Sequence, residues 1–247
     1  MTIEKKQELK SRLHPRNKNR EQYDLDALLS LYPKLEKYII KNRLGSKSLN
    51  FSNSKAVRIL NKALLHHYYG IKNWDFPKEN LCPAIPGRAD YIHHIADLLS
   101  KSNNGIIPLG RKITCYDIGV GASCIYPIIG VTEYQWDFIA SDTDPKSIQS
   151  ATAIVDHNPT LKNKITCSLQ KNPSDIFFGI IDKEDIIDVS ICNPPFHASA
   201  EEAEKSTFRK VKNLSGNRSE NPKRNFSGIS NELICDGGEY RFIINMI

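Results

Sequence analysis

Long hydrophobic runs, a signal-like start and paired cysteines are all missing from this chain of 247 residues. No apolar stretch approaches the ~20 residues that a transmembrane helix needs, and residues 1–10 are too charged for a signal peptide. We therefore expect a cytoplasmic protein that does not bind membranes. The six cysteines form no Cys-x-x-Cys pair, and several lie in apolar runs typical of strands. This pattern favours reduced core thiols over disulfides, and we expect no metal site.

Positive charge is concentrated in two segments. Residues 1–20 hold seven lysines and arginines against Glu4 and Glu8, and residues 205–224 hold seven against Glu220. The rest of the chain is mildly acidic, so the net charge of +6 comes from these segments. Basic segments on an acidic body favour a polyanionic partner, with nucleic acid the leading choice. The alternative is a pair of solvated segments without a ligand, which charge runs often are.

The N-terminal part of the chain indicates helices that precede a sheet. We expect residues 1–22 to form a flexible basic arm and residues 23–110 a helical annex. Hydrophobic periodicity in the annex predicts helices over residues 24–41, over residues 55–69 and from Asp90 onward. No strand is expected in this part of the chain.

From residue 111 onward, short apolar runs alternate with helical segments. The runs predict strands at residues 113–117, 136–141, 164–169 and 185–192. Alternating strands and helices are typical of an α/β fold with a mostly parallel, doubly wound sheet. We assign this Rossmann-like core to residues 111–247, including a basic substrate loop over residues 201–230.

A short glycine turn follows the first predicted strand, in the sequence Asp117-Ile118-Gly119-Val120-Gly121. Such a turn lets a ligand approach the backbone at the carboxyl end of the strand. The third glycine of Gly-x-Gly-x-x-Gly is absent, which disfavours a nicotinamide oxidoreductase. S-adenosylmethionine carries no phosphate and suits the shorter turn better. Asp142 ends the second predicted strand, where an acid binds ribose hydroxyls.

The sequence Asn193-Pro194-Pro195-Phe196 follows the fourth predicted strand. The Asn193 carboxamide oxygen and the Pro194 carbonyl can accept both hydrogens of an exocyclic amino group. The prolines fix the backbone, and Phe196 offers a face on which a base can stack. Taken alone, the four residues could simply end a strand and begin a turn. Together with the glycine turn and Asp142, they predict an S-adenosylmethionine-dependent methyltransferase that acts on a planar amino group.

With these motifs placed, the chain closely resembles the ribosomal large-subunit methyltransferase F family, which N6-methylates one adenine of bacterial 23S ribosomal RNA. It is more distantly similar to eukaryotic enzymes that modify U6 small nuclear RNA. The most specific stretches are His14-Pro15-Arg16-Asn17, residues 86–94, residues 117–122, residues 192–198 and Gly237-Gly238-Glu239. The resemblance implies a Rossmann-like class I methyltransferase core, a monomer, and adenine 1618 of 23S ribosomal RNA as the target.

The resemblance also implies roles for individual residues. Arg88 would pair with the methionine carboxylate of the cofactor, and Lys171 would lie near the cofactor entrance. Asp117, Gly119 and Gly121 would lie beside the cofactor, with Asp142 on its ribose. The predicted catalytic residues are Asn193, Pro194, Pro195 and Phe196. Predicted RNA contacts are Arg16, Asn17, Lys18 and Arg20 in the arm, and Arg209, Lys210 and Lys212 in the substrate loop, where relatives keep a basic stretch.

Family members continue beyond the position of Ile247 with the last strands of their sheet, so we expect a C-terminally shortened core. Two other functions stay open. A protein glutamine-N5 methyltransferase also positions an amide NH2 with an Asn-Pro-Pro-aromatic sequence. A catalytically impaired fragment that binds S-adenosylmethionine and RNA is the second alternative.

Overall fold

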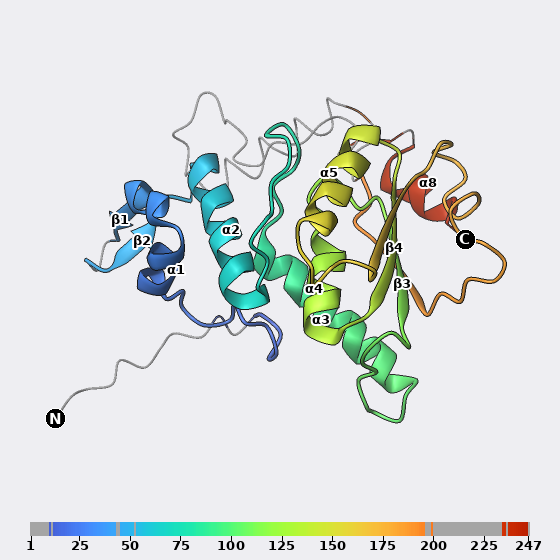
Figure 1. Ribbon diagram of the computed structural model, residues 1–247, viewed down its shortest axis with the longest axis horizontal. Coiled ribbons are helices and arrows are strands. Elements are labelled where there is room, and N and C mark those ends of the chain that lie inside the picture. The colour runs from blue at the N-terminus through green and yellow to red at the C-terminus, as the bar shows by residue number, and fades with distance from the viewer. Residues whose placement is uncertain are drawn as a thin grey trace.

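The computed structural model describes residues 10, 12–42, 45–51, 53–195, 199, 234–235 and 237–246. Short N-terminal elements lead through two long helices to a parallel sheet covered by helices (Figure 1). Among the described residues, no helix is both long and apolar enough to cross a membrane. The substrate loop over residues 201–230 lies outside the described residues, as do its predicted RNA contacts Arg209, Lys210 and Lys212.

The N-terminal elements pack as a small layered group. Helix α1 (Leu25–Leu31) is followed by the 3-10 helix η1 (Pro33–Tyr38), because proline at the start of the second segment ends the first. Helix α2 (Ser54–Tyr69) begins where the Asn53 side chain accepts hydrogen bonds from the backbone of Lys55 and Ala56. It ends at Gly70, which adopts the left-handed conformation.

Two predictions for this part of the chain are wrong. Strands β1 (Ile39–Lys41) and β2 (Lys47–Leu49) form an antiparallel hairpin where only helices were expected. Helix α3 (Ile85–Lys101) starts five residues before the predicted Asp90. Pro86 fits in the first turn of the helix, because the N–H groups there make no hydrogen bond within the helix. The first error came from reading Ile39–Lys41 as the end of a helix.

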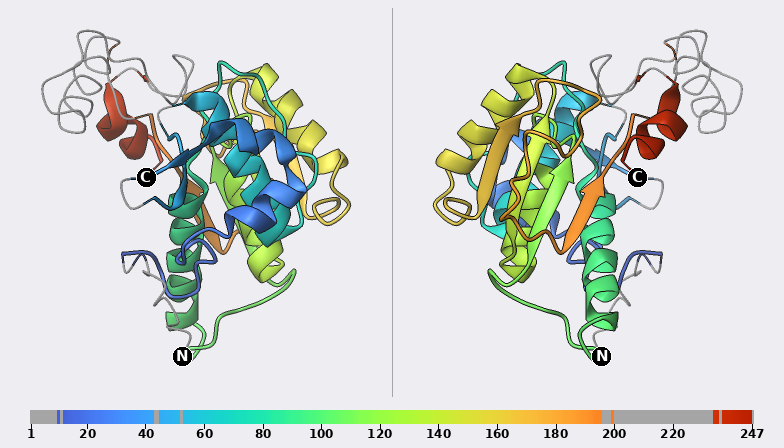
Figure 2. Two further views of the ribbon diagram at one scale, coloured as in Figure 1. Left: turned by 90° about the vertical axis from the view of Figure 1, so that its left-hand side faces the viewer. Right: turned by 90° about the vertical axis from the view of Figure 1, so that its right-hand side faces the viewer.

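The central sheet has the strand order β5-β4-β3-β6, and every pair is parallel. Its strands are β3 (Thr114–Ile118), β4 (Asp137–Asp142), β5 (Ile165–Leu169) and β6 (Val189–Cys192). The order can be followed in the right-hand view of Figure 2 from the gold β5 to the orange β6. The chain crosses from one side of β3 to the other between β5 and β6, which makes β3–β6 the switch point of the topology. The predicted mostly parallel Rossmann-like fold is confirmed.

Helices cover both faces of the sheet. Helices α4 (Ile125–Tyr134) and α5 (Pro145–Asp156) lie on one face, and α8 (Gly238–Ile244) lies on the other (Figure 1). Almost every residue of α4 is buried, since it packs between the sheet and α3. One continuous cluster of buried side chains runs from Leu28 to Ile191, across the predicted boundary at residue 110. The annex and the sheet therefore share a hydrophobic core.

The described part of the predicted flexible arm is ordered by hydrogen bonds to α3. The backbone N–H of His14 donates to Asp90 Oδ1 at 2.5 Å, and the Arg16 guanidinium donates to Asp97 Oδ1 at 2.6 Å. The Asn19 side chain is completely buried. The prediction of a flexible arm is therefore wrong for residues 12–22. Two cations of this stretch pair with acids of neighbouring helices, Arg16 with Asp97 on α3 and Lys18 with Glu133 on α4.

Candidate active site

The predicted site residues converge at the carboxyl edge of the sheet. Ile118, the last residue of β3, pairs with Cys192, the last residue of β6. The chain therefore leaves two adjacent strands side by side, as the glycine turn from β3 and as Asn193 from β6. Ligands of open α/β sheets bind at such a switch point, outside the carboxyl ends of the strands.

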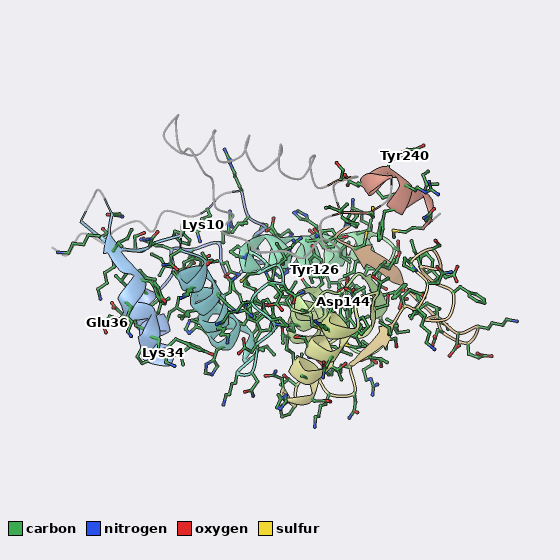
Figure 3. The ribbon with its side chains drawn as sticks, turned by 90° about the horizontal axis from the view of Figure 1, so that it is seen from above. Lys10, Lys34, Glu36, Tyr126, Asp144 and Tyr240 are labelled. Carbon is green, nitrogen blue, oxygen red and sulfur yellow. The ribbon has the colours of Figure 1, made fainter. Side chains whose placement is uncertain are left out.

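A cavity of about 490 Å³ opens at this edge. Its size lies in the range typical of small-molecule and cofactor sites. The walls come from the loop before α3, the turn after β3, the end of β4, the loop after β5, the end of β6 and α8. Figure 3 shows two of the lining residues, Tyr126 and Asp144, near the middle of the molecule, with Lys34 and Glu36 at one end and Tyr240 at the other.

The glycine turn keeps one wall of the cavity free of side chains. Its backbone is fixed because the N–H groups of Gly119 and Val120 both donate to the Ser141 carbonyl at 2.9 Å. Gly119 and Gly121 have φ of +75° and +65°, values that other residues rarely adopt. A Cβ atom added at either glycine would meet no other atom within 4 Å. Both glycines line the cavity, so this open space is available to a ligand.

Asp142 connects the end of β4 to the glycine turn. Its Oδ2 accepts a hydrogen bond from the Gly121 N–H, and its Oδ1 accepts one from the Asp144 N–H, both at 2.9 Å. Burial raises the pKa of this carboxyl, although the backbone donors oppose the shift. Asp142 lines the cavity, and each oxygen keeps capacity for a further donor.

Asp117 lies on β3 behind the cavity wall. The residue is 1% exposed, does not line the cavity, and neither carboxyl oxygen has a hydrogen-bond partner in the described part of the chain. Burial, and secondarily the charge of Asp142, raise the pKa of Asp117 well above its ordinary value. Burial thus disfavours the charged form of this carboxyl group in the folded protein. Its contact with the cofactor stays a prediction, because the structure does not place it on the cavity surface.

Asn193 and Arg88 are joined by a hydrogen bond inside the cavity. Arg88 Nη1 donates to Asn193 Oδ1 at 2.7 Å and to the Tyr126 hydroxyl at 2.6 Å. Arg88 is in the first turn of α3, Tyr126 in the first turn of α4, and Asn193 directly after β6. Burial raises the pKa of Tyr126 to about 12, so its hydroxyl stays neutral. No sequence motif pointed to Tyr126.

Of the remaining predicted residues, some line the cavity and others do not. Pro195 lines the cavity, whereas Pro194 does not. Lys171 is exposed and lies outside the lining, although its neighbour Gln170 belongs to it. Phe196 lies outside the described residues. The cofactor role of Lys171 therefore stays a prediction.

The predicted RNA contacts in the N-terminal segment already have partners within the protein. The Asn17 amide donates to the Pro86 carbonyl and to Asp90, and its oxygen accepts two hydrogen bonds from Asn19. Asn17 is 3% exposed and its amide fixes the turn, so its contact with RNA stays a prediction.

Cations of this segment also have internal partners. Arg16 pairs with Asp97, and Lys18 Nζ lies 2.9 Å from Glu133 Oε1. Their side chains are nevertheless 37% and 41% exposed, so RNA contacts of Arg16 and Lys18 stay predictions. Arg20 is half-buried, and its Nε has no hydrogen-bond partner among the described residues.

One group of potential metal ligands occurs in the described part of the chain. His14, His94 and Asp97 place one ligand atom each within 4.8 Å of one another. The Arg16 N–H donates to His14 Nδ1, so the proton of a neutral His14 ring is on Nε2, which faces Asp97 at 2.8 Å. With Arg16 also paired to Asp97, hydrogen bonds account for this group, and the expected absence of a metal stays a prediction.

A parallel sheet with a glycine turn after its first strand, an acid after the next and Asn-Pro-Pro after the strand across the switch point defines a Rossmann-like methyltransferase. The chain belongs to the RNA methyltransferase family, whose family model matches residues 7–247. It is thereby an enzyme of the RNA methyltransferase class, and its membership of the ribosomal large-subunit methyltransferase F family is confirmed.

Curated relatives match almost the whole chain. The chain is 53% identical over 238 residues to ribosomal RNA large subunit methyltransferase F of Cytophaga hutchinsonii, covering 96% of this chain and 74% of that protein. It is 52% identical to the protein of the same name in Bacteroides thetaiotaomicron, covering 96% and 80%.

Solved structures with the same fold include domains of METTL16. The human METTL16 catalytic domain in complex with MAT2A 3′UTR hairpin 1 superposes with a TM-score of 0.73 at 32% identity, covering 94% of this chain and 75% of that one. The N-terminal domain of human METTL16 in complex with SAH superposes with a TM-score of 0.64 at 33% identity, covering 82% and 78%.

Proposed function

We propose that this enzyme uses S-adenosylmethionine to methylate the N6 amino group of one adenine in 23S ribosomal RNA, adenine 1618 by its family. The observation that carries the proposal is the position of Asn193, which lines the same cavity as the glycine turn. An amide acceptor for amino hydrogens thus lies next to a backbone turn that suits a cofactor. The names of the curated relatives support ribosomal RNA as the substrate.

The residues around the cavity fit S-adenosylmethionine. Gly119 and Gly121 leave space along the backbone, and Asp142 has free acceptor capacity for ribose hydroxyls. Arg88 is a cation on the cavity wall that can pair with the methionine carboxylate. When bound, the cofactor would supply an electrophilic methyl group. The METTL16 domain solved with SAH supports this assignment.

Asn193 and Pro194 would prepare the target nitrogen. The lone pair of an adenine N6 is delocalised into the ring, which makes the amine a weak nucleophile. Asn193 Oδ1 and the Pro194 carbonyl would accept its two hydrogens and direct the lone pair towards the methyl group. The N–C bond would form as the S–C bond breaks, and the proton would then leave to solvent. Positioning, without a strong general base, would supply most of the rate enhancement.

The target adenine would have to leave its stack to reach this site. Enzymes that modify a base act on single-stranded substrate or turn the nucleotide out of a duplex. Asn193 and Pro195 are cavity-lining residues at a strand end, so a base within a helix is out of their reach.

Transfer of tritium from labelled S-adenosylmethionine tests the proposal. The acceptors are 23S ribosomal RNA from a strain that lacks the modification and, in parallel, protein from the same strain. We expect label in the RNA, recovered as N6-methyladenosine after nuclease digestion and mapped to one position. Label in protein would favour the glutamine methyltransferase. Cofactor binding without transfer to either acceptor would favour the impaired binding module.

A further inference from the structure

Among the described residues, Arg88 is a cation without a carboxylate in salt-bridge contact. Asp117 lies behind the wall, and burial raises the pKa of its carboxyl group well above the ordinary value. Arg88 also lies in the first turn of α3, where the helix dipole disfavours positive charge. The cavity wall at Arg88 is therefore prepared for an anionic group of a ligand.

The same guanidinium holds the acceptor that the target base needs. Arg88 Nη1 lies 2.7 Å from Asn193 Oδ1, and its second contact, to the Tyr126 hydroxyl, fixes its position. A charged donor on Oδ1 occupies one of its lone pairs and draws electron density from the other. The amino hydrogens of an adenine also carry positive charge. In the protein without cofactor, Asn193 is thus a poor acceptor.

An anion bound to Arg88 makes Asn193 a better hydrogen-bond acceptor. A carboxylate either takes the Nη1 hydrogen from Asn193 or neutralises the guanidinium from its free edge. Both weaken the hold of Arg88 on Oδ1, because charge-assisted hydrogen bonds are stronger than those to a neutral amide. The acceptor at Asn193 then becomes available.

We propose that Arg88 couples the two sites, so that binding of the carboxylate of the cofactor at Arg88 makes Asn193 competent to bind the target amino group. The inference rests on the proposed function and adds an order of binding to it, in which the cofactor binds first and the target base second. Arg88 is here a positioning residue for Asn193 as well as a contact of the cofactor. Linkage requires the converse, so that bound RNA strengthens cofactor binding by the same factor.

The test measures RNA affinity, not turnover. The RNA is a 23S fragment with the adenine mapped by methylation, and its dissociation constant is measured by fluorescence anisotropy with three states of the protein. These states are empty, saturated with S-adenosylhomocysteine, and saturated with 5′-methylthioadenosine, which keeps the adenosine and sulfur but lacks the carboxylate. We expect S-adenosylhomocysteine to tighten RNA binding about fivefold or more, and methylthioadenosine to leave it unchanged. An RNA with purine at the target position, lacking the amino group, should show no difference.

Two arginine variants identify the residue responsible. Arg88→Met should bind RNA equally in all three states and more tightly than the empty wild-type protein, because Asn193 is free. If Arg88 served only the cofactor, this variant would leave the affinity of the empty protein unchanged. Arg241→Met removes the second arginine that lines the cavity in the described part of the chain and should keep the effect of S-adenosylhomocysteine.

The outcomes separate the inference from the proposed function. Equal RNA affinity with and without S-adenosylhomocysteine, or an equal effect of methylthioadenosine, would overturn the coupling while methylation of the RNA still stood. Absence of both RNA binding and RNA methylation would overturn the proposed function itself and the coupling with it. The wild-type comparison needs no variant, so it decides the matter even if Arg88→Met fails to fold.

Discussion

At the scale of single residues, Asn193 is oriented before any substrate arrives. The residue comes directly after β6, where the following prolines restrict the backbone, and its carboxamide oxygen is fixed by Arg88. Tyr126 in turn holds Arg88 through its neutral hydroxyl. Three separate elements thus contribute to the geometry of one acceptor oxygen.

Replacement of Asn193 by alanine should abolish methyl transfer while cofactor binding is retained. We expect turnover to fall roughly 100-fold or more, since the amino group loses a positioned acceptor. Calorimetry with S-adenosylhomocysteine should show affinity close to that of the wild-type protein. Asn103→Ala is the matched control, because its amide donates to the Ile106 carbonyl in a loop outside the cavity. Turnover of Asn193→Ala comparable to that of Asn103→Ala would contradict the assignment.

His93 should make the protein less stable in weak acid. Burial, and secondarily the charges of His14 and Arg16, lower the pKa of His93 from 6.5 to about 4. Its Nδ1 lies 2.6 Å from the Tyr134 hydroxyl, which also accepts a hydrogen bond from Arg16 Nε. The hydroxyl hydrogen is therefore directed at Nδ1, and a protonated ring could no longer accept it.

The sign of the effect follows from the lowered pKa. The unfolded chain binds a proton at His93 as the pH falls through 6.5, whereas the folded protein resists until about 4. The free energy of unfolding should decrease across that window, by on the order of 3 kcal/mol from this residue. Urea unfolding of wild type and His93→Gln between pH 7 and pH 4 measures it. If the free energies of unfolding of the two proteins declined in parallel with falling pH, His93 would not be the source of the pH dependence.

At the scale of elements, the glycine turn is the part of the site that sequence changes should affect most sharply. Gly119→Ala forces a Cβ into the left-handed region, which costs about 1–2 kcal/mol of stability, and directs a methyl group into the cavity. We expect cofactor affinity to fall as well. Gly105→Ala carries the same backbone cost at φ +77° in a loop away from the cavity. Its affinity for S-adenosylhomocysteine should stay unchanged, and an equal loss in both variants would assign the effect to stability alone.

Helices and strands were predictable from the sequence where the hydrophobic pattern extended over enough residues to be recognised. The strand predicted at residues 136–141 is β4 (Asp137–Asp142), and the helix predicted at residues 55–69 is α2 (Ser54–Tyr69). The β1–β2 hairpin was missed because three-residue strands show no clear alternation. The ordered segment over residues 12–22 was missed because its stability comes from acids on α3, which are distant in sequence.

The site was predictable to the same extent. Asn193, Gly119 and Asp142 follow strand ends, and parallel strands bring those ends together, so their convergence could be deduced. The role of Arg88 was inferred only from the family resemblance, since nothing in the local sequence distinguishes it from other residues in the first turn of a helix. Tyr126 could not be found, because its role depends on how α3 packs against α4.

At the scale of the whole molecule, the distribution of charge decides where RNA binding can be tested. Described cations of the N-terminal segment such as Arg16 and Lys18 pair with acids of the protein. Removing residues 1–20 would therefore break buried hydrogen bonds as well as remove charge. The basic substrate loop offers a cleaner test, since its charges can be neutralised singly or together.

Replacement of Arg209, Lys210 and Lys212 by glutamine should weaken RNA binding in a salt-dependent way. Loss of three phosphate contacts to single-stranded RNA should reduce the slope of log affinity against log salt by about 2. The control neutralises three exposed lysines, Lys101, Lys112 and Lys162, none of which lines the cavity. Anisotropy titrations from 50 to 300 mM salt, about the range in which such slopes are measured, check this prediction. A slope unchanged from wild type would exclude the loop as a phosphate contact.

The pairing of Ile118 with Cys192 has a consequence for how the enzyme can work. The residues that would meet donor and acceptor leave neighbouring strands, which in any sheet lie about 4.8 Å apart. The backbone ladder thus sets the distance between the two segments that would hold donor and acceptor. Changes that shift β6 against β3 should accordingly slow methyl transfer even when every side chain of the site is kept.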